Sequence, residues 1–149
     1  MSFHFSSESL YENIFLLQML VCGSEDYCSE FSIRSDRYEN RREWTDYHVR
    51  LKSKVSTLVI ETSIKSRMLA DFIDRQTYIK TKKSNELLQL ACDNSELGYV
   101  LEGDINFTLR ESFNKIVHAT EANLVWDRQT GDNGDYQTWN GVIEMSGWH

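Results

Sequence analysis

The sequence predicts a mainly α-helical fold, a helical bundle with a long central helix and a β-hairpin at its C-terminus. Three observations support this. Proline, which interrupts helices, is absent from all 149 residues. Apolar side chains recur at helical spacing in three segments. Four of the seven glycines lie in the last 20 residues, where the pattern changes to that of strands and a turn, namely Gly131, Gly134, Gly141 and Gly147.

The size and composition of the chain predict one domain. With 149 residues, 40 % hydrophobic and 12 % aromatic, the chain can bury a core, which excludes disorder, collagen and disulfide-rich miniproteins. We expect a single helical domain over residues 1–149, with the hairpin at about 124–149. The longest apolar run, residues 14–22, is shorter than the roughly 20 residues of a membrane span. No membrane association is therefore expected.

The cysteines indicate the compartment. Cys22, Cys28 and Cys92 are an odd number and lack metal-ligand spacing. They predict reduced thiols in a cytoplasmic protein.

The first helix is expected to begin at a capping box, in which Ser9 and Glu12 bond the first free amides. Apolar residues then follow at helical spacing, with two aromatic residues widening the face: Leu10, Ile14, Leu17, Val21, Tyr11 and Phe15. The helix is expected to end before Gly23. Residues 24–43 are polar and predict either a long loop or a solvated helix.

The second helix is expected over about residues 44–75. Its core stripe consists of Leu51, Val55, Leu58, Val59, Thr62, Leu69 and Ile73. Ile60, Ile64 and Arg67 lie on roughly the opposite side. This second patch predicts that neighbours, or a second subunit, cover the helix on two faces.

Three elements are expected after the long helix. Residues 85–92 form a short helical segment. A second capping box, Thr108 with Glu111, starts a helix that runs to about residue 122. The pattern then predicts two strands, at residues 124–126 and 136–145, joined by a turn at 131–134. Trp126, Trp139 and Trp148 are interpreted as packing residues.

Charge is distributed unevenly along the chain. The net charge is -7, but residues 34–83 hold 13 of the 16 basic residues against seven acids. Residues 1–33 have five acids and no basic residue. A basic middle segment attracts phosphate, an acidic partner or the acidic ends of the same chain.

One row of polar residues has the composition of a catalytic site. Arg110, Asn114 and His118 are spaced four apart along the helix after Thr108, turned away from its apolar stripe. A histidine can accept a 2'-hydroxyl proton and an arginine can bind phosphate, as metal-independent RNA cleavage requires. The alternative is an ordinary solvated helix face whose charges pair with Glu111 or Glu121.

The row also carries a family resemblance. Residues 109–119, LRESFNKIVHA, follow a long helix containing SIKSRMLADF at 63–72. Together these segments resemble small proteins of the HEPN superfamily. The resemblance implies an all-helical, dimeric RNase of toxin-antitoxin or phage-defence systems. It also implies that His118 is the general base or acid, Arg110 the phosphate ligand and Asn114 an orienting group.

The row departs from the HEPN pattern in two ways. Seven residues separate Arg110 from His118, where HEPN proteins have four to six, and Glu111 rather than asparagine follows the arginine. Either the cationic, RNA-binding role has passed to Lys115 or Arg67, or the site is inactive.

No metal or cofactor is expected. His4 and His149 lie at the chain ends, and His48, at the start of the long helix, is expected to be solvated. Asp132 and Asp135 suit turn geometry rather than calcium.

Two functions follow from the sequence. The first is a HEPN-like, metal-independent endoribonuclease, acting as a homodimer on RNA and paired with a cognate antitoxin or toxin. The second is a non-catalytic interaction protein, such as an antitoxin, immunity factor or inhibitor, that uses the same fold to bind a protein partner. The acidic net charge favours the second function, and the basic segment 34–83 favours the first.

Overall fold

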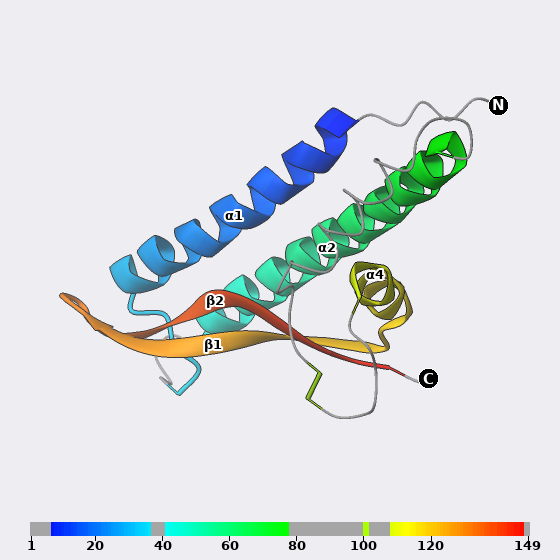
Figure 1. Ribbon diagram of the computed structural model, residues 1–149. Coiled ribbons are helices and arrows are strands. Elements are labelled where there is room, and N and C mark those ends of the chain that lie inside the picture. Colours follow the sequence, from blue (N-terminus) through cyan, green and yellow to red (C-terminus); the bar gives the residue numbers. More distant parts are fainter. Residues whose placement is uncertain (1–6, 37–40, 78–99, 102–107, 148–149) are drawn as a thin grey trace.

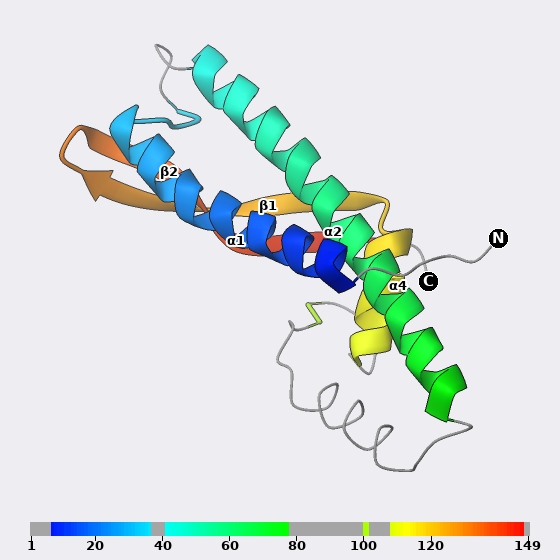
Figure 2. The ribbon, with the colours of Figure 1, turned by 90° about the horizontal axis from the view of Figure 1, so that it is seen from above.

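The structure is a computed structural model that describes residues 7–36, 41–77, 100–101 and 108–147. In these ranges it contains helices α1 (Ser7–Glu30), α2 (Arg41–Thr77) and α4 (Leu109–His118), then strands β1 (Glu121–Gly131) and β2 (Gly134–Ser146). α1 and α2 run antiparallel beside each other against the hairpin, and α4 packs on α2 (Figures 1 and 2). The predicted mainly helical fold with a C-terminal hairpin is confirmed. The segments 85–92 and 148–149 lie outside the described residues.

α1 is longer than predicted at both ends. Because the helix already includes Ser7, Ser9 lies inside it, and the capping box predicted there is wrong. α1 also continues through Gly23, although a glycine in a helix costs about 1 kcal/mol relative to alanine. Ser24 and Cys28, which follow that glycine, are both buried, and this packing outweighs the cost. Residues 24–30 are therefore a partly buried end of α1 rather than a loop or a solvated helix.

α2 confirms the long helix predicted at 44–75. The first half of the predicted stripe faces the core, since Leu51, Val55 and Leu58 are all buried, and the side chain of Ile73 lies outside the described residues. Ile60 and Ile64 on the other side are exposed, and Ile60 borders a groove beside α4. α2 thus supplies one wall of the core along its first half.

α4 begins as predicted and ends earlier. The hydroxyl of Thr108 accepts a hydrogen bond from the amide of Glu111 at 3.2 Å, which confirms the second capping box. The helix ends at His118 instead of about residue 122 because Glu121 already pairs with Ser146 in the hairpin. Strand pairing satisfies the backbone groups that another helical turn would have used.

The hairpin contains a bulge. β1 and β2 pair antiparallel from Glu121 and Ser146 to the turn at 131–134, which confirms the predicted turn. Between the pairs Leu124–Ile143 and Trp126–Trp139, β1 has one residue and β2 has three. Gly141, in the bulge, has a φ of 88°, a conformation that favours glycine. Because the excess in β2 is two residues, both pairs keep their side chains on one face of the hairpin.

Trp139 joins the hairpin to both helices. Its side chain is 2 % exposed and packs with Leu51, Val55 and Leu124, and residues of α1 border this cluster. The hydroxyl of Ser24 accepts a hydrogen bond from the Trp139 amide at 3.0 Å. A second donor to the same oxygen is the Thr138 hydroxyl, at 3.2 Å. Trp139 is therefore a packing residue, as predicted, and α1 is fixed to β2 by a buried hydroxyl.

Leu51→Ala is expected to lower the free energy of unfolding by about 2–5 kcal/mol, because it leaves a cavity beside Trp139. Val49→Ala, two positions away on α2 with a 57 % exposed side chain, is the matched control, with an expected change under about 1 kcal/mol. Urea unfolding followed by circular dichroism measures both. Equal losses would contradict this placement of the core.

Candidate functional site

The residues predicted to carry chemistry lie on α4. His118 is exposed in the last turn, which also contains Lys115. Asn114 is half-buried, and its Oδ1 atom is buried without a hydrogen-bond partner. Arg110 lies in the first turn, but its side chain is outside the described residues. The structure thus places two of the three side chains of the row.

The two predicted RNA-binding residues lie on neighbouring helices. Arg67 is exposed on α2, and Lys115 is half-buried on α4, which packs against α2. Asn114 differs from the exposed His118 because its amide oxygen is buried without a hydrogen-bond partner. Leaving such an oxygen unpaired costs about 1–3 kcal/mol.

His48 is placed differently from the prediction. Its ring stacks on Trp44 and lies against Trp126, with ring centroids 5.5 Å away in both cases. Burial in this aromatic cluster lowers the pKa of His48, and the nearby Lys52 ammonium lowers it further. The expected solvated role is therefore wrong. Trp126 is a packing residue, as predicted, although its indole Nε1 is buried without an acceptor.

A buried thiol and a phenol meet where α1 crosses α2. The phenol ring of Tyr47 stacks on Tyr27 with centroids 5.0 Å apart. Burial raises the pKa of Tyr47 to about 12, and burial likewise raises the pKa of the Cys28 thiol. Both groups stay protonated at neutral pH, so this cluster is structural. Cys22, also a free thiol, is exposed on α1.

Large apolar side chains are exposed on the side of the helix pair that points away from the hairpin. At about 100° per residue, Phe15 and Met19 lie roughly 160° from the core-facing Leu17. Ile64 lies about 180° from the core-facing Val55. We call this surface the outer face, and it consists of Tyr11, Phe15, Met19, Ile64 and Met68.

The outer face was only half predicted. Ile64 belongs to the second patch predicted on the long helix, but the sequence pattern predicts Tyr11 and Phe15 on the core side of the first helix, and this prediction is wrong. The signal was present in the sequence, because Tyr11, Phe15 and Met19 are spaced four apart. Their stripe could not be distinguished from the true core stripe by hydrophobicity alone.

Metal clusters and membrane-spanning helices are both absent from the described ranges. Within them, no three His, Cys, Asp or Glu side chains are close enough to hold a metal ion. In the same ranges, no helix combines the length and the apolar character that crossing a membrane requires. Neither result identifies a function.

Acidification is expected to destabilise the folded protein because of His48. Because its pKa is lower in the folded protein than the unfolded value of about 6.5, the unfolded chain binds the proton more readily. The free energy of unfolding should therefore decrease as the pH falls below about 6.5. His48→Gln should reduce this decrease in urea titrations between pH 7.5 and 5.0, whereas His118→Gln, at an exposed position, should not. Identical pH profiles for wild type and His48→Gln would contradict the effect.

Comparison of the chain with protein-family models, curated proteins and solved structures found no match. The HEPN resemblance therefore remains a prediction.

Proposed function

We propose that this chain is an interaction protein that binds another protein chain through its outer face. The observation that carries the proposal is the exposure of five large apolar side chains there, ranging from 43 % for Ile64 to 70 % for Tyr11. Monomeric proteins rarely expose large contiguous apolar patches, and such patches commonly mark binding surfaces. Antitoxins, immunity factors and inhibitors are proteins of this kind.

The charges around the outer face indicate which chain fits it. α1 has five acidic residues and no lysine or arginine, whereas α2 has eight lysines and arginines against five acids. Among the described residues, no acid of α1 forms an ion pair, and Glu61 of α2 meets α1 through a hydrogen bond from the neutral Asn13 amide. The acidic and basic helices therefore do not neutralise each other through ion pairs within the described part of the chain.

A second copy of the chain offers complementary charge and apolar surface to both helices at once. A two-fold axis that lays α1 of one copy on α2 of the other brings acidic surface to basic surface twice and buries both apolar stripes. Placing α1 on α1 would instead bring five acids against five. The expected assembly is therefore a homodimer in which α1 packs on α2 of the second copy.

Light scattering at micromolar concentration is expected to give the mass of a dimer. Ile64→Glu should shift the protein to a monomer, because it places a charge in the centre of the buried surface. Val142→Glu is the matched control, since Val142 is 45 % exposed but lies on the hairpin. A monomeric wild type, or a dimer that tolerates Ile64→Glu, would contradict the proposed interface.

A second function, metal-independent RNA cleavage, is proposed for α4. The observation that favours it is the exposure of His118 in a turn shared with a second basic residue. In this proposal His118 takes or returns the 2'-hydroxyl proton, Arg110 stabilises charge on the phosphate and Asn114 orients the reacting groups. Arg67 and Lys115 bind the RNA backbone. The net charge of -7 opposes RNA binding, which makes this the second proposal.

If α4 is a nuclease site, purified protein should cleave total or transfer RNA in the presence of EDTA. His118→Ala should reduce the rate by about 100-fold or more, the usual contribution of a general acid or base. Arg110→Ala should have a comparable effect. Because His118 is exposed, helical circular dichroism should be unchanged in its variant. An inactive wild type, or an active His118→Ala protein, would exclude this role.

A further inference from the structure

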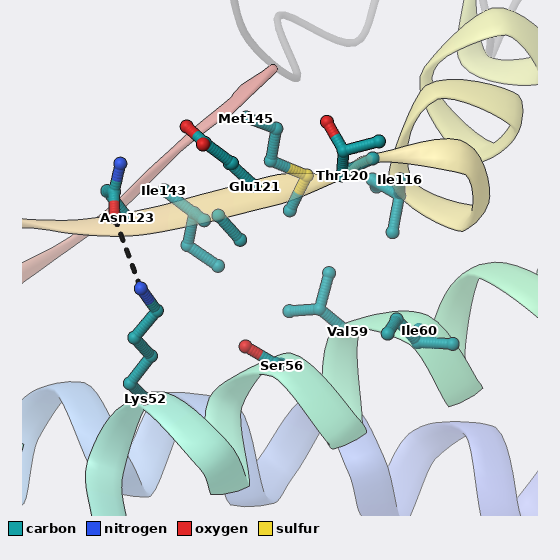
Figure 3. Close-up of a pocket in the computed structure, with 12 residues that line it drawn as sticks. Lys52, Ser56, Val59, Ile60, Ile116, Thr120, Glu121, Asn123, Ile143 and Met145 are labelled. Atoms are coloured by element: carbon teal, nitrogen blue, oxygen red, sulfur yellow. Dashed lines mark hydrogen bonds between the residues drawn. The ribbon is translucent and has the colours of Figure 1, made fainter. Parts of the chain in front are cut away.

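A groove of about 500 Å³ opens between α2, α4 and the hairpin (Figure 3). It lies on the side of α2 that faces α4, and its lining includes none of the residues of the outer face. Its volume is in the range of small-molecule binding sites. Its apolar lining comes from all three elements and includes Val59, Ile60, Ile116, Ile143 and Met145.

One cation faces this apolar space. The ammonium of Lys52 donates a hydrogen bond to Asn123 Oδ1 at 3.1 Å, and an ammonium has three donors. Among the described residues, no carboxylate forms an ion pair with it. The carboxylate of Glu121, although it belongs to the rim, points away from Lys52 (Figure 3). Two donors of a half-buried cation are therefore available to a ligand.

A hydroxyl lies one turn further along the same helix. Ser56 follows Lys52 by four residues, so both side chains lie on one side of α2. In Figure 3 the Ser56 hydroxyl points into the groove. It forms no hydrogen bond with a described residue. An ammonium and a hydroxyl thus lie at the polar end of a groove whose remaining lining is mostly aliphatic.

We propose that this groove binds a small monocarboxylate with an aliphatic body. The carboxylate would accept hydrogen bonds from Lys52 Nζ and Ser56 Oγ, and the hydrocarbon would lie between Val59, Ile143 and Met145. One ammonium matches a single negative charge, whereas phosphate groups are usually held by several cations or by the fork of an arginine. This binding site depends neither on dimer formation through the outer face nor on nuclease activity of the α4 row.

A chain-length series tests the apolar half of the proposal. Isothermal titration of the purified wild-type protein with butanoate, hexanoate and octanoate should show affinity rising about fourfold for each added methylene group. Octanol, which has the same body without the charge, should bind at least about tenfold more weakly than octanoate. Absence of octanoate binding at millimolar concentration, or equal binding of octanol, would overturn the proposal.

Variants test the polar half. Lys52→Met keeps the length of the side chain and removes its charge, so octanoate affinity should fall about tenfold or more. Lys54→Met, an exposed position two residues away, should leave affinity unchanged. Ala122→Leu narrows the groove without touching the cation and should also weaken binding, with circular dichroism confirming the fold. Equal effects of Lys52→Met and Lys54→Met would show a non-specific charge effect and overturn the site.

Discussion

The burial of Trp139 against two helices determines several other features of this fold. Because α1 extends past Gly23, the Ser24 hydroxyl accepts hydrogen bonds from the Trp139 backbone amide and the Thr138 hydroxyl. The β2 strand must also bulge at Gly141, where the backbone adopts a positive φ and where a Cβ would lie 3.4 Å from the Val21 side chain. The extended end of α1 and the bulge in β2 are therefore both parts of the packing around the Trp139 side chain.

The same packing explains why two surfaces remain available. The hairpin packs on one side of the α1 and α2 pair, and among the described elements none covers the opposite side (Figures 1 and 2). Beyond the bulge, Ile143 and Met145 still face α2 but are separated from it by the groove that ends at α4. The outer face and the groove are thus consequences of how a two-stranded sheet covers longer helices.

The predictable parts of the fold are those encoded locally. The apolar period of α2, the Thr108 cap and the glycine turn at 131–134 each depend on residues close together in the chain, and each is confirmed. The end of α1, the contact of the His48 ring with Trp126 and the exposure of Tyr11 depend on contacts with segments distant in sequence. Period alone identifies a helix, but it cannot say which of two apolar stripes will be covered. For the same reason, the sequence predicts that Arg110, Asn114 and His118 share one side of α4, but it does not predict the partial burial of Asn114.

The distribution of charge favours one of the two proposed functions over the other. A nuclease needs its cations directed at phosphate, and most basic residues lie in the segment that forms α2 and the residues on either side of it. If a second copy lays its acidic α1 on α2, those cations are neutralised by protein and are no longer available to RNA. If RNA binds there instead, the acidic α1 beside it opposes the approach of the backbone. The segregation of acid on α1 and base on α2 therefore favours pairing between protein chains, and any RNA site would have to lie at the α4 end, away from the acidic helix.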